Sequence, residues 1–292
     1  MSQHIKNLPV LPAIMVIEAV KSALLEDLGR AGDITSMATI PQDARAKAQL
    51  VSRQHGVLAG QALGETAFLL SDGGLEVSWH KRDGDVLSPG DAVATIEGPA
   101  RGLLSGERVA LNFLGHLSGI ASATHSFARK IAHTKCKVVC TRKTTPGLRA
   151  FEKYAVRCGG GSSHRFGLDD AILIKDNHIA VAGGVAIAIE RARDFAGHLV
   201  KIEVEVDTLE QLKEALIAKP DVIMLDNMGP EQLKEAVVIN EGQALLEASG
   251  GINLDTVTAI AESGVDVVST GWITHSAPVL DLGLDINIDA NS

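Results

Sequence analysis

The spacing of apolar and polar residues along the chain changes near residue 136. Before this point, Ala13 to Leu28 has helical spacing and ends at Gly29, a residue typical of a helix C-terminus. A strand-like pattern from Arg45 to Ala59 follows, and then a predicted helix from Gly60 to Leu70. Three turns separate the next short strands: Asp72-Gly73-Gly74, Asp83-Gly84-Asp85 and Ser88-Pro89-Gly90-Asp91. This part predicts an α+β domain.

From Cys136 onward, short β-branched runs alternate with segments of helical spacing such as Leu209 to Ala218 and Pro230 to Ile239. Strands that alternate with helices in this way favour parallel strands joined by right-handed crossovers. Six or more such units predict a barrel with fewer than eight repeats. The predicted strands are Cys136–Thr141, Ala171–Lys175, Val200–Val206, Val222–Leu225, Ala244–Ala248 and Val265–Ser269.

Each predicted strand ends in polar residues that can do chemistry. In a β/α barrel the carboxyl ends of the strands form one rim, and catalytic groups gather there. The strand from Lys201 to Val206 alternates strictly, so Lys201, Glu203 and Glu205 are expected to face the barrel mouth while its apolar residues face the outer helices.

The rim is rich in cations, which indicates a ligand with several negative charges. Arginine binds carboxylates and phosphates in a bidentate manner. We expect Arg149 and Arg157 to lie on a solvated helix face instead. The cations expected to bind ligand are Arg142, Lys143, Arg165 and Lys175, with His164 close to them in sequence.

Two strand ends carry small residues, Ser249-Gly250-Gly251 and Ser269-Thr270-Gly271, each placed just before an expected helix start. Backbone N–H groups at such turns bind phosphate, and the last two loops of these barrels often do so. Glu205 and Asp226 could hold ribose hydroxyls, Mg²⁺ on a pyrophosphate, or a developing positive charge, and a structural salt bridge is the alternative for each.

Composition narrows the function classes. A net charge of -9 and an aromatic content of 3% argue against general nucleic-acid or membrane-surface binding. We find no secretory signal and no run of about 18 apolar residues, so we expect a cytoplasmic protein. The three cysteines, Cys136, Cys140 and Cys158, are expected to be reduced core thiols, and no protein-only metal site is predicted.

Several segments resemble the quinolinate phosphoribosyltransferase family (nicotinate-nucleotide pyrophosphorylase, carboxylating). The resemblance covers nearly the whole chain, in order and with compatible spacing. The segments that carry it are Gly32–Ser36, Gly106–Asn112, Thr141–Arg149, Glu152–Val156, Gly159–Gly161, His164–Phe166, Leu173–His178, Glu203–Glu205, Leu225–Asn227 and Glu247–Ile252.

The resemblance implies an N-terminal α/β sandwich domain (1–117, joined by 276–292) and an open, roughly seven-stranded α/β barrel (118–275). It implies transfer of a phosphoribosyl group from phosphoribosyl pyrophosphate (PRPP) to quinolinate with decarboxylation, a step of NAD biosynthesis. Members are homodimers or multiples of dimers with shared active sites, and Mg²⁺ binds with PRPP.

The same resemblance implies roles for individual residues. Arg142, His164, Arg165 and Lys175 would hold quinolinate, together with Arg108 from the partner subunit. Lys143, Glu205 and Asp226 would serve PRPP and its Mg²⁺. The 5′-phosphate would be held by Ser249, Gly250, Gly251, Ser269, Thr270 and Gly271.

Two other functions stay open. Lys175 at a strand end could form a Schiff base, as in a class I aldolase. The chain could also be a non-catalytic or differently specific paralogue, such as the phosphoribosyltransferase-like protein found beside molybdate transporters.

Overall fold

The computed structural model of the chain describes residues 8–287. The chain divides into two compact units. The described part of the first comprises residues 8–123, Arg157–Gly160 and 277–287, and the second comprises Thr124–Val156 and Gly161–Ser276.

A four-stranded antiparallel sheet is the centre of the first unit. Its order is β12-β1-β5-β3, formed by Leu282–Asn287, Arg45–Ser52, Ala92–Pro99 and Glu76–Trp79. The last strand therefore returns to pair with the first along Lys47 to Ser52. A separate two-stranded ribbon joins β2 (Gly56–Val57) to β4 (Val86–Leu87).

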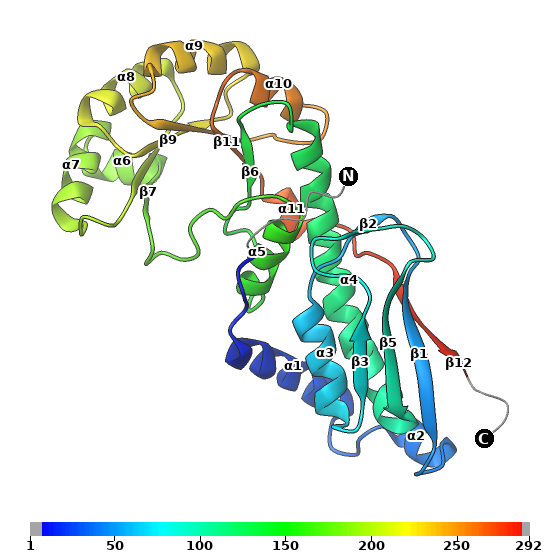
Figure 1. The fold of residues 1–292 in the computed structure, drawn as a ribbon. Coiled ribbons are helices and arrows are strands. Elements are labelled where there is room, and N and C mark those ends of the chain that lie inside the picture. The colour runs from blue at the N-terminus through cyan, green and yellow to red at the C-terminus, as the bar shows by residue number, and fades with distance from the viewer. Residues whose placement is uncertain (1–7, 288–292) are drawn as a thin grey trace. The chain divides into compact units, whose positions relative to one another are not determined.

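Helices α1 (Ala13–Leu28), α2 (Ile34–Thr39), α3 (Gln61–Ser71) and α4 (Ala100–Lys130) accompany this sheet (Figure 1). In α1 the buried residues are Val16, Val20 and Leu24, and this four-residue spacing places them on one face, as the sequence predicted. Helix α3 lies close to α4 at Gly64, where an added Cβ would come within 2.8 Å of Leu114. A larger residue at this position would have to displace the Leu114 side chain.

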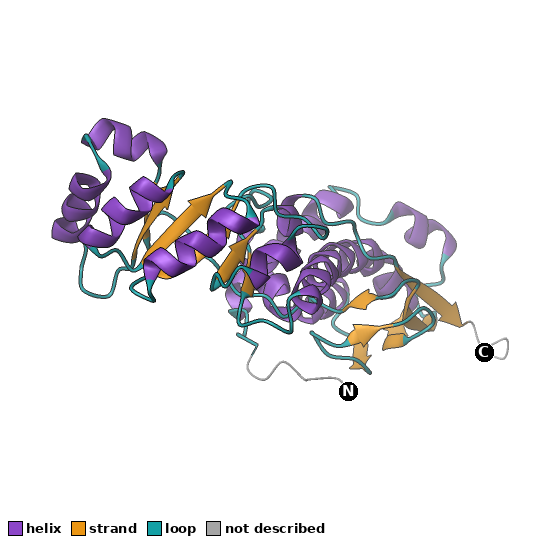
Figure 2. Ribbon diagram, turned by 90° about the horizontal axis from the view of Figure 1, so that it is seen from above, coloured by secondary structure: helices purple, strands orange, loops and turns teal. Residues whose placement is uncertain are grey.

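The second unit is built on six parallel strands. Their order is β6-β11-β10-β9-β8-β7, and every pairing is parallel. The strands are Lys137–Val139, Val267–Ser269, Leu245–Ser249, Val222–Asp226, Ile202–Val206 and Ile172–Ile174. Their arrows lie side by side in Figure 2.

The register of these strands sets polar residues at defined depths. Glu205 of β8 and Glu247 of β10 both pair with Met224 of β9, so the three residues form one level across the sheet. Asp226 pairs with Ser249 one step nearer the carboxyl ends. Because side chains alternate along a strand, residues two positions apart share a face, and both levels open toward the same side.

Helices α7 (Val185–Phe195), α8 (Leu209–Ala218), α9 (Pro230–Asn240) and α10 (Val257–Glu262) follow one another along one side of this sheet (Figure 1). Each packs against the next, and α7, α8 and α10 also touch strands. Helix α8 begins with a capping box, in which Thr208 accepts the backbone N–H of Gln211. The remaining helices are α5 (Arg149–Cys158), α6 (Asp176–Ala182) and α11 (Trp272–His275).

The predicted α/β class with an open parallel sheet is confirmed. Among the described residues this sheet has six strands, in line with the six or more units of the sequence pattern and one fewer than the roughly seven that the resemblance implied. A single parallel bridge from Val139 to Ser162 lies beyond β6. Glycines 159–161 next to Ser162 explain why this segment forms no longer strand. The boundary expected between residues 117 and 118 falls inside α4.

Across the described part of the chain, no helix combines the length and apolar character needed to cross a membrane. All three cysteines are buried, as expected, and form no disulfide among the described residues. Burial raises the pKa of Cys136 to about 12, which keeps that thiol protonated and unreactive.

Candidate active site

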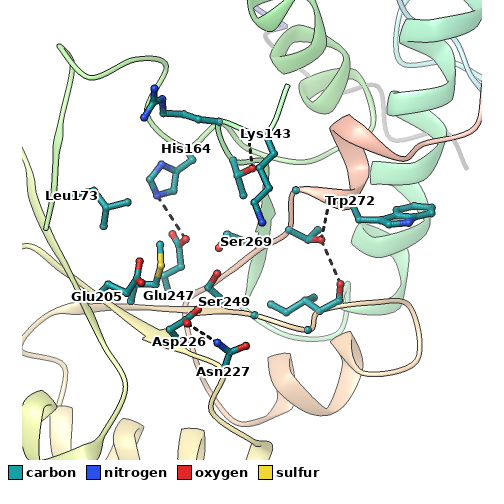
Figure 3. Close-up of a pocket in the computed structure, with 18 of the residues that line it drawn as sticks. Lys143, His164, Leu173, Glu205, Asp226, Asn227, Glu247, Ser249, Ser269 and Trp272 are labelled. Carbon is teal, nitrogen blue, oxygen red and sulfur yellow. Dashed lines mark hydrogen bonds and ion pairs between the residues drawn. The ribbon is translucent and has the colours of Figure 1, made fainter. Parts of the chain in front are cut away.

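A cavity of about 910 Å³ opens at the carboxyl ends of the parallel strands, within the second unit (Figure 3). This size fits a substrate of several rings or phosphate groups. Its walls come from the strands of the second unit and from the loops that follow them. They include Thr141, Arg142, Lys143, His164, Arg165, Leu173, Lys175, Glu205, Met224, Asp226, Asn227, Glu247, Ser249, Gly250, Gly251, Ile252, Asn253, Ser269, Thr270, Gly271, Trp272 and His275.

Four cationic side chains line this cavity: Arg142, Lys143, Arg165 and Lys175. Arg165 donates one guanidinium N–H to the carbonyl of Ala171 at 3.2 Å, while its Nε is buried without a hydrogen-bond partner among the described residues. Burial and the neighbouring charge of Arg142 lower the pKa of Arg165. An anion placed here would satisfy the open donor and relieve this repulsion.

The loop that carries Arg165 is held in place from both sides. The carboxylate of Asp170 accepts the backbone N–H groups of Phe166 at 2.7 Å and Gly167 at 2.9 Å. Arg149 donates to the carbonyl of Phe166 at 3.0 Å, so it orders this loop rather than lying free on a solvated helix face. The guanidinium of Arg165 is thus presented by a braced loop.

Two carboxylates near the rim are already paired. Glu205 Oε2 lies 2.5 Å from Lys175 Nζ; the lysine side chain is half-exposed, whereas that of Glu205 is mostly buried. Asp226 Oδ2 accepts from the side-chain amide of Asn227 at 2.6 Å. The Lys175 nitrogen is engaged by Glu205, which disfavours the Schiff-base alternative because that chemistry needs a lysine nitrogen free to attack a carbonyl.

His164 lies deeper, between two buried glutamates. Its Nδ1 accepts the backbone N–H of Arg165 at 2.8 Å, and its Nε2 lies 3.0 Å from Glu203 Oε2 and 3.7 Å from Glu247 Oε1. These partners assign the ring proton to Nε2, facing the carboxylates. Burial lowers the pKa of His164, but the hydrogen bond to Glu203 and the charges of both glutamates outweigh it and leave the pKa raised.

Glu247 forms the floor of the cavity and is 4% exposed. Burial, reinforced by the charge of Glu203, raises its pKa to about 7. Its Oε1 and the Oε1 of Glu203 are buried without hydrogen-bond partners among the described residues. Near neutral pH, Glu247 therefore retains a proton that an ordinary glutamate would have lost.

One ligand atom each from His164, Glu203 and Glu247 lies within 4.8 Å of the others, so these groups could surround a metal ion. The sequence predicted no such site. The cationic cavity wall and the ammonium of Lys153, whose Nζ lies 3.1 Å from the carbonyl of His164, would repel a metal ion at this position. The arrangement therefore favours a proton shared among His164, Glu203 and Glu247 over a metal ion.

The loops after β10 and β11 approach the cavity through glycines. Gly250 has φ +87°, and an added Cβ would lie 2.1 Å from Asn227 Oδ1. At Gly271 an added Cβ would lie 2.8 Å from Lys143 Cδ. Helix α10 begins only at Val257, so a turn and not a helix start faces the cavity after β10. Helix α11 begins soon after β11 but has only four residues. The expected helix start directly after Gly251 is wrong, because Asn253 Oδ1 caps an intervening turn at Asp255 and Thr256.

Of the site residues predicted from the sequence, all but Arg108 line this one cavity. Arg108 lies exposed on α4 in the first unit. The sequence predicted that Lys201 faces the cavity, and this prediction is wrong. Lys201 lies at the opposite end of its strand and pairs with Asp221 at 2.5 Å. Its neighbour Glu203 does turn inward, toward His164.

Sequence reasoning gave no role to Glu247 or Lys153. Glu247 could have been noticed as a lone acid inside the apolar strand Leu245–Ser249. Lys153 lies on a helix that reads as amphipathic, yet it is fully buried, with Nζ 3.2 Å from Cys140 Sγ and 5.1 Å from the ring centre of Phe166. Only the tertiary structure reveals this burial.

Comparisons with known proteins identify the family. The models of the N-terminal and C-terminal domains of quinolinate phosphoribosyl transferase match residues 33–118 and 120–285. The chain is 46% identical to a probable nicotinate-nucleotide pyrophosphorylase (carboxylating) of Bacillus subtilis, over 92% of each chain. It is 43% identical to the corresponding Mycobacterium leprae protein, over 92% of this chain and 96% of that one.

A solved structure supports the same assignment. The nicotinate-nucleotide pyrophosphorylase from Francisella tularensis is 38% identical and superposes with a TM-score of 0.92, over 97% of this chain and 99% of that one. Sequence and structure agree over nearly the full length. The chain therefore belongs to the quinolinate phosphoribosyltransferase family.

Proposed function

We propose that this chain transfers a phosphoribosyl group from PRPP to quinolinate and releases pyrophosphate and CO2, giving nicotinate mononucleotide for NAD biosynthesis. Its relatives carry the name of this carboxylating pyrophosphorylase. The observation that carries the proposal is the cavity itself. Four cations, an unpartnered buried guanidinium N–H and two glycine turns surround it, as a dicarboxylate and a phosphorylated sugar require.

Arg142, Arg165 and Lys175 are the groups that hold quinolinate in this proposal. Arg165 offers its open Nε to one carboxylate, and the arginine fork allows bidentate binding. His164 completes the expected set, but both of its ring nitrogens already have partners. A direct bond from His164 to the substrate requires that one of these two contacts opens.

Lys143, Glu205 and Asp226 serve PRPP in this proposal. The turns Ser249-Gly250-Gly251 and Ser269-Thr270-Gly271 hold its 5′-phosphate through backbone N–H and hydroxyl groups. Mg²⁺ fits the site only as part of the PRPP complex, because Glu205 and Asp226 are too few ligands for a dedicated cage. When bound, it supplies positive charge to the pyrophosphate leaving group.

The chemistry needs no side-chain nucleophile. The pyridine nitrogen attacks the anomeric carbon as pyrophosphate leaves, so positive charge develops on the ribose ring. Glu205 and Asp226 stabilise that charge, while Lys143 stabilises the departing pyrophosphate. The alkylated ring nitrogen then stabilises the electron pair that remains when the 2-carboxylate leaves as CO2.

A homodimer with shared active sites completes the proposal. Arg108 is exposed on α4, and no hydrogen bond or ion pair of its guanidinium is found among the described residues. The first unit also exposes Ile14 and Leu25 on α1 and Ile34 and Met37 on α2. Apolar surface of this kind is typical of a subunit interface. We assign Arg108 to the quinolinate pocket of the partner subunit.

A product assay tests the function. Purified protein is incubated with quinolinate, PRPP and Mg²⁺, and nicotinate mononucleotide, pyrophosphate and CO2 are each quantified. We expect the three products in equal amounts, and no reaction when either substrate is omitted. Absence of the nucleotide under all these conditions contradicts the proposal and favours a non-catalytic paralogue.

A further inference from the structure

The proposed reaction leaves one chemical requirement without an assigned residue. When CO2 departs, its bonding electron pair remains on the ring carbon next to the nitrogen. The product carries hydrogen at that carbon, so the active site or the solvent must deliver one proton. Given the proposed function, the group that delivers this proton can be sought among the residues that line the cavity.

An acid suited to this step must line the cavity and hold a proton near neutral pH. The arginines fail the second condition because a guanidinium does not release its proton in proteins. Lys175 is fixed in its ion pair with Glu205. His164 has one ring proton, and that proton is directed at Glu203.

Glu247 meets both conditions. Its carboxyl group lies in the cavity floor, level with Glu205 and Met224 across the sheet. Burial and the nearby charge of Glu203 raise its pKa to about 7, whereas His164 and a hydrogen bond with Ser269 act in the opposite direction. Its Oε1 is buried and makes no hydrogen bond within 3.5 Å among the described residues.

The neighbours of Glu247 suit a group that alternates between acid and carboxylate. His164 Nε2 lies 3.7 Å from Glu247 Oε1, close enough to stabilise the carboxylate once the proton has left. Glu203 is buried behind His164, does not line the cavity, and favours the protonated form of Glu247. Glu203 thus favours the return of a proton to Glu247, and His164 stabilises Glu247 after the proton has left.

We propose that Glu247 is the catalytic acid that delivers the proton replacing the carboxylate lost as CO2. The bond between the ring carbon and the carboxylate breaks, and its electron pair stays on the ring carbon beside the alkylated nitrogen. CO2 leaves, the O–H bond of Glu247 breaks, and the new C–H bond forms. Glu247 is left as a carboxylate and regains a proton from water at the cavity after the product departs.

The decisive variant is Glu247→Gln, which keeps the size of the side chain and removes the acid. Pyrophosphate and CO2 are measured separately in a single turnover, and the nucleotide is identified by mass. We expect pyrophosphate release to persist while CO2 release slows by about 10²–10⁴-fold. A nucleotide that still carries both carboxyl groups should accumulate.

Two control variants accompany it. Glu247→Asp keeps an acid at the same position and should recover part of the CO2 release. Glu235→Gln makes the same chemical change on the exposed face of α9, outside the cavity, and it should keep pyrophosphate and CO2 in equal amounts.

Equal slowing of pyrophosphate and CO2 in Glu247→Gln would overturn the inference, since it would indicate a structural or binding role. Unchanged CO2 release would overturn it as well, because water or a lysine would then be the donor. Either result with an active wild-type protein leaves the proposed function intact. An inactive wild-type protein contradicts the proposed function itself.

Discussion

At the scale of single residues, Arg165 is the clearest candidate for substrate recognition. Its Nε is buried and finds no hydrogen-bond partner within residues 8–287, and the charge of Arg142 helps to lower its pKa. A buried donor without a partner costs free energy, which a bound carboxylate returns. The free protein is therefore prepared for an anion at this position.

We predict that Arg165→Ala weakens quinolinate binding far more than PRPP binding. Loss of one partner of a buried charge pair costs about 2–5 kcal/mol, which corresponds to roughly 30- to several-thousand-fold in affinity. Calorimetric titration of each ligand measures both effects. Lys201→Ala is the charge-matched control, because Lys201 lies outside the cavity and should leave both affinities unchanged. Equal losses for the two ligands in Arg165→Ala would refute the assigned role.

Glu247 gives a second prediction at this scale, on stability. Its pKa is about 7 in the folded state against an ordinary value of 4.5, so the folded state binds more protons between these values. The free energy of unfolding should therefore fall as pH rises from about 4.5 to about 7, and then level off. The loss attributable to Glu247 is about 3 kcal/mol. Glu247→Gln should remove this part of the pH dependence.

Urea unfolding followed by Trp272 fluorescence provides the measurement. Trp79→Phe as the background leaves Trp272, which lies in the second unit beside Phe127, as the single tryptophan reporter. The free energy of unfolding of the Trp79→Phe protein is measured with and without Glu247→Gln, and the difference between the two is compared at pH 5 and pH 8. A difference that does not change with pH would show that Glu247 ionises normally in the folded state.

At the scale of elements, the loop after β10 is the part of the site with the least steric freedom. The backbone N–H of Asn227 donates to the carbonyl of Ser249 at 2.9 Å, which ties the ends of β9 and β10 together. Gly250 follows directly, with a positive φ and Asn227 Oδ1 against its Cα. The position of Asp226 thus depends on a glycine in the neighbouring loop.

We predict that Gly250→Ala weakens PRPP binding by more than about tenfold, because the new Cβ must displace Asn227 and with it Asp226. Gly251→Ala is the matched control. Gly251 also has a positive φ, but an added Cβ would meet no atom within 4 Å. Both variants keep their backbone N–H groups. Similar losses in the two would mean that backbone strain alone, not the contact with Asn227, limits binding.

The same elements show how far the sequence alone can be taken. The helices Ala13–Leu28 and Leu209–Ala218 begin and end where the apolar spacing predicted; Gly29 ends the first, and Thr208 caps the start of the second. Strand ends were predicted within about two residues, and the cations at those ends do share one cavity. The burial of Lys153 and the raised pKa of Glu247 were not predictable, because both arise from contacts between segments distant in sequence.

At the scale of the whole molecule, α4 is the element that sequence spacing described least well. It runs from Ala100 to Lys130 and contributes residues to both compact units. Arg108 lies exposed in its first half. A solvated helix residue would serve no purpose in catalysis, whereas the dicarboxylate proposed here needs several cationic donors. The assignment of Arg108 to a partner subunit can be tested without any knowledge of the interface.

We predict that Arg108→Ala and Glu205→Ala are each nearly inactive as homodimers and recover activity when mixed and allowed to re-equilibrate. In a mixed dimer, one of the two sites has an intact barrel together with an intact arginine donated by the other chain. Random pairing makes about half of the dimers mixed and half of their sites intact, so activity should return to about one quarter of the wild-type value. Mixing Glu205→Ala with Asp226→Ala is the matched control, because both residues line the cavity of one chain and every mixed site stays damaged. If Arg108 acted within its own chain, its mixture with Glu205→Ala would remain as inactive as this control.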